Sequence, residues 1–252
     1  MHTDDTGLET GRFALPSQSD HMPAFLAKPA GGNRPLPIVI VIQEIFGVHE
    51  HIRDICRRLA KLGYLAIAPE LYFRQGDPSA YNDIGELFKG LVAKVPDSQV
   101  MADLDHTAHW AATHGGDGKR LAVTGFCWGG RIAWLYAAHN PQLKAAAAWY
   151  GKLVGDKTLT TPRHPVEIVR ELVAPVLGLY GGQDTGILAE HIEAMRLALN
   201  DAGADADIRV YPDAGHAFYA DYRASYHAAS AEDGWRRMLQ WFAQHGMQGD
   251  GK

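Results

Sequence analysis

Short runs rich in β-branched residues alternate with amphipathic stretches along most of this 252-residue sequence. The clearest run, residues 37–42, is apolar throughout, as expected of a strand that is covered on both faces. Residues 51–62 follow with apolar side chains at helical spacing, and Gly63 marks the end of that helix. The alternation predicts repeated βα units, and therefore an α/β fold with a mostly parallel central sheet flanked by helices on both faces.

The other elements follow from the same patterns. We expect strands at 64–68, 120–124, 145–150, 176–180 and 208–211, and helices at 84–91, 98–114, 129–139, 187–202 and 232–245. Ser98 is the expected N-cap of its helix, 115–118 a loop, and 70–96 an excursion that could form a lid or substrate wall. Because no repeat or linker is visible, we predict a single domain over 1–252, with frayed tails at about 1–8 and 246–252.

The charge and the apolar runs limit the partners of the chain. The formal net charge is -5 and no run is rich in lysine or arginine, which argues against a nucleic-acid partner. No apolar run approaches the roughly 20 residues that span a bilayer, and the first residues are acidic and polar rather than typical of a signal peptide. We therefore expect a cytoplasmic protein with no membrane partner, while monomer and homodimer both stay open.

Only two cysteines are present, Cys56 and Cys127, with no CxxC or CxxH spacing. They are too few for a disulfide framework, so any cysteine function belongs to a thiol. His49 and His51 could suggest a metal pair, but without a third ligand at a recognisable spacing a solvated helix start is favoured. We expect neither a metal nor a cofactor. The polar residues Asp103, Asp105, His106 and His109 are taken as one solvated helix face.

The run Gly125-Phe126-Cys127-Trp128-Gly129 lies between an expected strand and an expected helix. A glycine-flanked turn of this kind exposes its middle side chain, because the glycines let strand and helix approach closely. Cys127 would then lie at a helix N-terminus, where backbone N–H groups favour the thiolate. The sequence predicts a cysteine nucleophile, although a small buried filler would fit the pentapeptide as well.

Two further residues fall where a hydrolase with this turn needs them. Such enzymes place the acid after a later strand and the histidine after the last strand. Asp184 follows the strand expected at 176–180, and His216 follows the strand expected at 208–211. Taken singly, Asp184 could be an N-cap and His216 an exposed loop residue. Their joint placement favours a Cys127-His216-Asp184 triad.

The loop after residues 37–42 supplies other candidate groups. Ile45 stands where α/β hydrolases place one oxyanion-hole N–H, and the second belongs to the residue after the nucleophile, Trp128. Glu44 is a charged residue at the end of a buried strand, which is costly unless it has a partner or a task. Pairing with an arginine would explain it structurally, and a catalytic role would explain it functionally.

Five segments in this order have a common counterpart: Gln43-Glu44-Ile45-Phe46-Gly47, Pro69-Glu70-Leu71-Tyr72, Gly125-Phe126-Cys127-Trp128-Gly129-Gly130, Asp184 and Gly215-His216-Ala217-Phe218. Over about residues 38–242 the chain resembles the dienelactone hydrolase (carboxymethylenebutenolidase) family. The resemblance implies the α/β-hydrolase fold, with Cys127 as nucleophile, His216 as general base and then acid, and Asp184 orienting the imidazole. It also implies that Glu44 contacts the resting thiol and helps to deprotonate it when substrate binds.

The resemblance implies hydrolysis of a small ester or lactone through a Cys127 acyl-enzyme. Family members that cleave dienelactone hold a substrate carboxylate with arginines, one of them four residues after the histidine, where this chain has Ala220. Arg223 lies nearby, and Arg74 matches a family segment without matching a known carboxylate contact. This departure puts dienelactone itself in question, and the resemblance implies a dienelactone-like enol lactone or a related carboxylic ester as the substrate.

Aromatic residues could line the substrate pocket, or they could be ordinary core residues. The candidates are Phe46, Tyr72, Trp128, Trp149, Tyr150 and Phe218. Two alternatives for the function stay open. The same site could accept another electrophile, such as a thioester or an organophosphate triester, or the thiol could serve a redox sensor or a non-catalytic binding protein.

Overall fold

The computed structural model describes residues 2–16, 21–32 and 34–249. They form two compact units. The first unit holds the described residues up to 121 together with 158–162 and 249, and the second holds 122–157 and 163–248. One domain over residues 1–252 stays a prediction.

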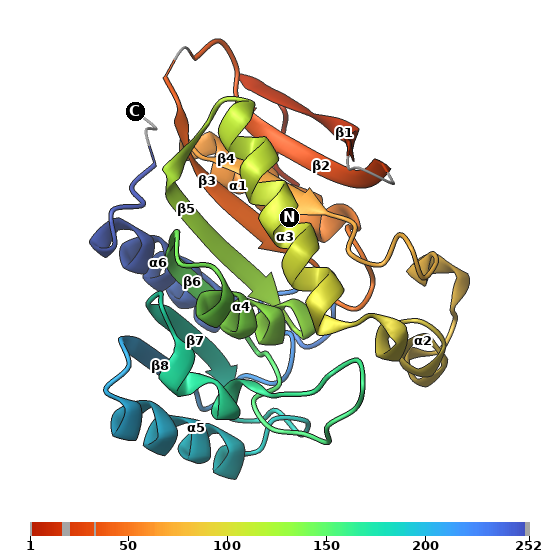
Figure 1. Cartoon of the computed structure of the whole chain (residues 1–252), viewed down its shortest axis with the longest axis vertical. Helices are drawn as coiled ribbons and strands as arrows, with labels where there is room; N and C mark the ends of the chain where they lie inside the picture. Colours follow the sequence, from red (N-terminus) through yellow and green to blue (C-terminus); the bar gives the residue numbers. More distant parts are fainter. Residues whose placement is uncertain (1, 17–20, 33, 250–252) are drawn as a thin grey trace. The chain divides into compact units, whose positions relative to one another are not determined.

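The first unit contains four complete strands in the order β1-β2-β4-β3, with bounds β1 Leu8–Pro16, β2 His21–Pro29, β3 Leu36–Ile42 and β4 Leu65–Pro69. Strands β1 and β2, and β2 and β4, pair antiparallel, whereas β3 and β4 pair parallel. The helices are α1 Glu50–Lys61, α2 Ile84–Gly90 and α3 Asp97–Thr113, with short 3₁₀ turns η1 Pro78–Ala80 and η2 Val92–Lys94. Both α1 and α3 pack on these strands (Figure 1).

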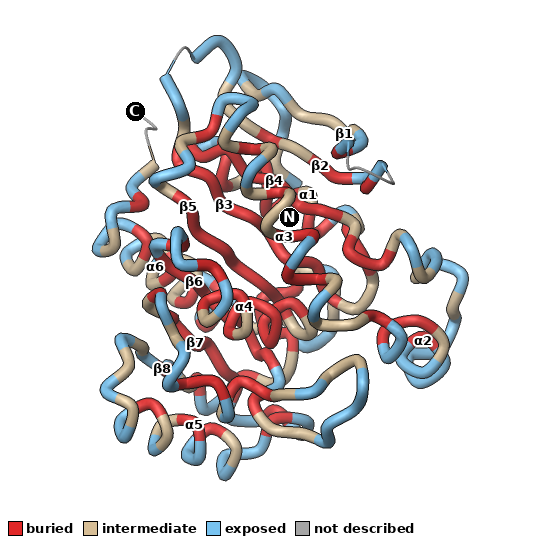
Figure 2. The backbone as a smooth tube through the Cα atoms, viewed as in Figure 1, coloured by how far each residue is buried: buried red, intermediate tan, exposed pale blue. Residues whose placement is uncertain are grey.

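Strands β3 and β4 carry the core of the first unit. Six of the seven residues of β3 and all five of β4 are buried, and Figure 2 shows both strands as buried along their length. Continuous apolar runs suit strands that are covered on both faces. The predicted strands at 37–42 and 64–68 are thus confirmed to within one residue.

Strand β5, Gly116–Phe126, runs from the first unit into the second. It begins four residues before the predicted start at 120, so the loop predicted at 115–118 is wrong. Glycine and aspartate are poor strand formers, which is why the sequence suggested a loop. In the structure Gly116 is buried close to the side chain of Ile38, and this contact leaves no room for a larger residue.

The second unit contains parallel strands in the order β6-β7-β8. Its elements are α4 Trp128–His139, β6 Leu143–Trp149, η3 Pro165–Glu167, η4 Val169–Glu171, β7 Val176–Gly181, α5 Ala189–Ala202, β8 Ala206–Tyr211 and α6 Ala228–Gln244. Helices α4 and α6 pack on β6, and α5 packs on η3 and η4. The βα repeats predicted from sequence are confirmed here, with boundary shifts of a few residues.

Helix α3 begins at Asp97, and Pro96 rather than Ser98 occupies its N-cap position. The Ser98 prediction was therefore wrong. No side chain caps this end, but the Asp97 N–H donates to the Thr160 carbonyl at 2.8 Å. A loop backbone thus satisfies one of the N–H groups that a helix start leaves open.

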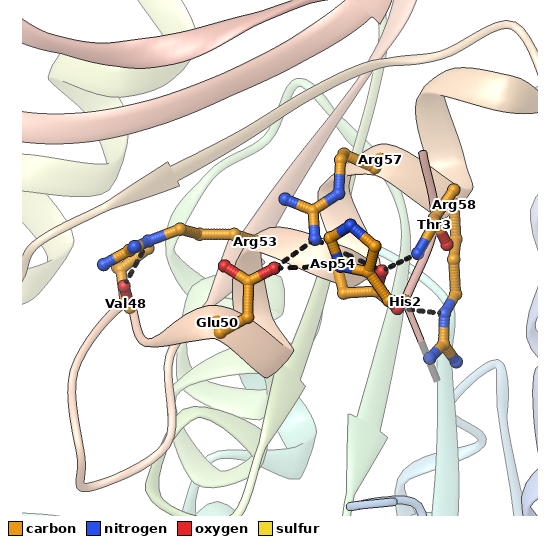
Figure 3. A network of polar contacts seen from close by, with 8 residues as sticks. All are labelled: His2, Thr3, Val48, Glu50, Arg53, Asp54, Arg57 and Arg58. Atoms are coloured by element: carbon orange, nitrogen blue, oxygen red, sulfur yellow. Dashed lines mark hydrogen bonds and ion pairs between the residues drawn. The ribbon is translucent and has the colours of Figure 1, made fainter. Parts of the chain in front are cut away.

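The N-terminal segment differs most from the predicted frayed tail. Thr3 N donates to Asp54 Oδ1 on α1 at 2.6 Å, and Asp54 also pairs with Arg57 and Arg58 (Figure 3). At the other end Met247 is fully buried. The described parts of both tails are therefore held by packing or hydrogen bonds, while residues 1 and 250–252 of the predicted tails lie outside the described residues. Within the described ranges, no helix is both long and apolar enough to cross a membrane.

Candidate active site

Cys127 lies in a tight turn between β5 and α4, at the N-cap position of the helix. Its backbone has φ 56° and ψ -114°, a left-handed conformation that is unusual for any residue but glycine. A Cβ on Gly125 would lie 2.0 Å from the carbonyl oxygen of Gly129, so only glycine lets strand and helix approach this closely. The strained turn presents the Cys127 side chain, which is half-buried.

His216 bridges Cys127 and Asp184. Its Nε2 lies 3.2 Å from Cys127 Sγ, and its Nδ1 lies 2.7 Å from Asp184 Oδ2. All three residues belong to the second unit, where they come from the loops after β5, β7 and β8. Parallel strands bring their carboxyl ends to one edge of a sheet, which is how residues 89 positions apart in the chain can touch.

Asp184 serves two sets of partners with its two oxygens. Oδ1 accepts hydrogen bonds from Gly186 N at 2.8 Å and Ile187 N at 3.1 Å, while Oδ2 faces His216. The side chain is 2% exposed. Asp184 thus orders its own loop while it faces His216. The helix N-cap role considered from the sequence was wrong, because Leu188 occupies that position in α5.

The surroundings of His216 favour its protonated form. Burial by itself would lower the pKa of the imidazole, but the hydrogen bonds and charges of Asp184 and Cys127 outweigh it and raise the pKa from 6.5 to about 10. The Tyr150 ring also meets the imidazole edge-on, with centroids 5.3 Å apart. Near neutral pH the geometry favours an imidazolium facing the sulfur.

Two of the predicted substrate contacts, Trp149 and Phe218, lie in the second unit. Trp149 and Phe218 are fully buried, and Trp149 Nε1 donates to Thr124 Oγ1 at 3.1 Å. Their rings belong to an aromatic cluster, in which Trp149 and Phe218 lie 5.9 Å apart. Both residues thus pack in the core of this unit, and their contact with substrate stays a prediction. Trp128 is half-buried.

The first unit holds the other predicted site residues. Ile45 and Phe46 are half-buried and keep some access to solvent, but Tyr72 is 1% exposed. The predicted pair of oxyanion donors, Ile45 and Trp128, has one member in each unit and stays a prediction.

Glu44 is buried, with 1% of its side chain exposed. Its Oε2 lies 3.1 Å from His49 Nε2, so a histidine is one partner of this buried carboxylate. His49 is half-buried and His51 is 5% exposed, which shows that the solvated helix start predicted for them was wrong. Among the described residues, no cluster of three histidine, cysteine or acidic side chains is arranged to hold a metal ion.

Asp103 is also more than part of a solvated helix face. It is buried, and its Oδ2 accepts a hydrogen bond from Arg74 Nη1 at 2.7 Å. A charge pair between α3 and the segment after β4 therefore explains both residues structurally.

The comparisons with known proteins agree on one family. The sequence pattern described as "Dienelactone hydrolase family" matches residues 22–246. A Yersinia pestis protein provisionally named carboxymethylenebutenolidase is 70% identical over 241 residues, covering 96% of this chain and 90% of that protein. The crystal structure of a provisionally named dienelactone hydrolase from Klebsiella pneumoniae subsp. pneumoniae has 68% identity and a TM-score of 0.93, and the match covers 94% of this chain and 99% of that chain.

Structures with lower sequence identity support only the assignment of the fold. A dienelactone hydrolase-like promiscuous phosphotriesterase from metagenomic libraries has 20% identity and a TM-score of 0.75, covering 95% of this chain and 99% of that chain. The predicted α/β-hydrolase fold class is confirmed. From the family match and the close relatives we conclude that the chain belongs to the dienelactone hydrolase family and is a carboxymethylenebutenolidase-like hydrolase.

Proposed function

We propose that this hydrolase cleaves a small carboxylic ester or lactone through a thioester on Cys127. The observation that carries the proposal is the hydrogen-bonded chain from Asp184 through His216 to Cys127. A nucleophile, a base within hydrogen-bonding reach and a third group that orients the base are the parts that covalent catalysis needs.

The first half of the reaction forms the thioester. The Cys127 thiolate attacks the carbonyl carbon while the imidazolium of His216 faces the sulfur at 3.2 Å. When the tetrahedral intermediate collapses, the C–O bond breaks and the departing alkoxide or enolate takes the proton from His216 Nε2. The backbone N–H groups of Ile45 and Trp128 are the proposed donors to the oxyanion.

The second half releases the acid. Neutral His216 takes a proton from a water molecule, which attacks the thioester carbonyl, and Cys127 leaves as a thiolate beside the imidazolium. Asp184 keeps Nδ1 of the ring protonated through the 2.7 Å contact, so that Nε2 is the atom that accepts and returns the proton. By its resemblance to the family glutamate, the Glu44 carboxylate is the proposed acceptor of the resting thiol's proton when substrate binds, and it returns this proton to the Cys127 thiolate when the product leaves.

Two positions support a proposal for the substrate class. One is Ala220, where family members that cleave dienelactone have an arginine, and the other is Arg74. Ala220, four residues after His216, is fully buried and brings no charge. Arg74 is bound to Asp103 at 2.7 Å and lies over the Phe73 ring. Because neither position offers a guanidinium for a substrate carboxylate, we propose an ester or lactone without a free carboxylate next to the scissile bond.

An activated uncharged aryl ester tests the reaction. Purified protein should turn it over, and Cys127→Ala and His216→Ala should each lower kcat by roughly 10³-fold or more, because the chemistry depends on both side chains together. Cys56→Ala is the matched control, since it removes the other thiol and should keep kcat within about twofold of the wild-type value.

Three results would contradict the proposal. Unchanged turnover in Cys127→Ala would exclude the thioester. Faster cleavage of a carboxylate-bearing lactone than of its uncharged analogue would contradict the substrate class. Reversible oxidation of Cys127 with no turnover of any ester, thioester or organophosphate triester in a panel would favour a thiol sensor.

A further inference from the structure

The loop that carries Glu44 ends at a histidine in an unusual position. His49 is the N-cap residue of α1, yet its side chain makes no capping hydrogen bond. Serine, threonine, aspartate and asparagine are the residues that stabilise this position best. The His49 side chain turns to Glu44 instead, with Nε2 at 3.1 Å from Oε2. Helix capping therefore does not explain a histidine at this position.

The contact lies in an almost dry setting. Glu44 has 1% of its side chain exposed and His49 has 26%. Removing a carboxylate from water costs free energy that a hydrogen bond to the charged form offsets. Such bonds to ionised groups are stronger than neutral ones, and they also fix the orientation of the acceptor. A donor on His49 Nε2 is thus suited to hold Glu44 both ionised and in one rotamer.

The backbone around this pair is braced at several points. Glu44 and Gly47 form an isolated β-bridge, and Gly47 has φ 78°, a conformation that strains any other residue. Val48 N donates to Glu70 Oε2 at 3.1 Å. Val48 O accepts from Arg53 Nε at 2.9 Å, as Figure 3 shows. These contacts hold the backbone on both sides of the pair.

Other charged groups border the pair in the first unit. The pKa of Glu70 is raised by its burial, which the hydrogen bond from Val48 only partly offsets. The His51 ring stacks on His49 with centroids 6.1 Å apart, and Arg53 anchors the following turn.

We propose that His49 is a positioning residue that holds the Glu44 carboxylate ionised and oriented for its part in activating the Cys127 thiol. The proposal rests on the proposed function, since it needs Glu44 to act in ester hydrolysis. His49 acts through Glu44 and touches no reacting atom.

Two substitutions separate this role from a structural one. His49→Ser supplies a good N-cap, which offsets part of the free energy lost with the hydrogen bond to Glu44, but it has no group long enough to reach that carboxylate. The melting temperature should therefore change by only a few degrees while kcat/KM for the aryl ester falls about tenfold. His49→Gln keeps an N–H donor on a longer side chain and caps poorly, so kcat/KM should recover to within about threefold of wild type. If His49 only stabilised the start of the helix, kcat/KM would follow capping ability, and His49→Ser would be more active than His49→Gln.

The chain offers a matched control at a second N-cap histidine. His227 precedes α6, and its side chain does cap that helix through Ser230. His227→Ser replaces a capping histidine by a capping serine and should leave kcat/KM unchanged. His49→Asn, which also caps well, repeats the test if His49→Ser fails to fold.

A double-mutant cycle links the effect to Glu44. In the Glu44→Gln background, His49→Ser should change kcat/KM by less than about twofold, because the carboxylate it holds is gone. A tenfold loss that persists in that background, or wild-type activity of His49→Ser, overturns the proposal. If Glu44→Gln alone is as active as wild type while Cys127→Ala is inactive, the assigned role of Glu44 fails and the thioester mechanism survives.

Discussion

The two cysteines of this chain have opposite surroundings. Cys56 lies in the middle of α1 with no exposed surface, and burial raises the pKa of its thiol. Cys127 lies at the start of α4, half-buried, with a histidine nitrogen 3.2 Å from its sulfur. The same side chain is therefore inert packing in one helix and a candidate nucleophile at the end of another, and its place in the fold decides which.

The strongest way to break this contrast is to remove the group that orients His216. Asp184→Asn should lower kcat by roughly 10³- to 10⁴-fold, because the amide cannot hold the imidazole in the right tautomer. The loop should survive, since the amide oxygen can still accept from Gly186 and Ile187. Asp213→Asn is the exposed control and should be silent. Steady-state kinetics with the aryl ester measures both, and comparable rates for the two variants would contradict a role for Asp184.

Alkylation of the folded protein compares the two thiols directly. With iodoacetamide at neutral pH, Cys127 should react on the order of 100-fold faster than Cys56, because one thiol faces an imidazolium and the other is sealed in the core. Peptide mass spectrometry at timed intervals gives both rates. In denaturant the two should become similar, and similar rates in the native protein would remove the basis of the comparison.

The pH dependence of stability sharpens the Cys127 side of the contrast. Since the pKa of His216 rises from 6.5 to about 10 on folding, the stabilisation linked to its protonation is complete below pH 6.5 and is lost as the pH rises through about 10. The wild-type free energy of unfolding should therefore fall more between these values than that of His216→Gln. Urea unfolding at intervals of pH tests this, and parallel curves would mean that the imidazole is not held by its neighbours.

Serine substitutions should give the smallest changes in stability. One variant should lose stability and keep its activity, and the other should lose activity and keep its stability. Cys56→Ser buries a hydroxyl in an apolar setting and should lower the free energy of unfolding by about 1–3 kcal/mol while kcat is kept. Cys127→Ser lies at a half-buried turn, so its stability should stay within about 1 kcal/mol of wild type while turnover drops. Thermal unfolding and the ester assay on the same samples give the result. Equal stability losses in both variants would show that the two environments do not differ as described.

The sequence was sufficient for elements with strong periodicity or strict turn chemistry. The run at β3 and the glycine-flanked turn at Cys127 each admit few conformations, and the order of Asp184 and His216 followed from the strands that precede them. The structure then brings these three side chains into one hydrogen-bonded chain. Local pattern and tertiary structure agree there because the turns leave little freedom.

Features that depend on contacts between distant residues could not be predicted in this way. The hairpin of β1 and β2 was missed because its partner strand, β4, lies about forty residues further along the chain. Strand β5 starts at Gly116 because glycine allows close packing there, although glycine has a low propensity for strands. The pair of Glu44 and His49 was overlooked because a histidine at an N-cap carries no signal by itself. A buried carboxylate with a histidine five residues later was the one available clue.

The Asp184 side chain loses its conformational entropy when the protein folds, before any substrate binds. With Oδ1 fixed by two backbone N–H groups and Oδ2 by His216, the side chain has no torsional freedom left to lose when an ester arrives. That ordering cost is met during folding instead, when the loop after β7 closes around the oxygen. The loop around Asp184 therefore lowers the entropy cost of reaching the transition state and lowers the free energy of unfolding in return. Loosening this loop should slow catalysis without changing any group that touches the substrate.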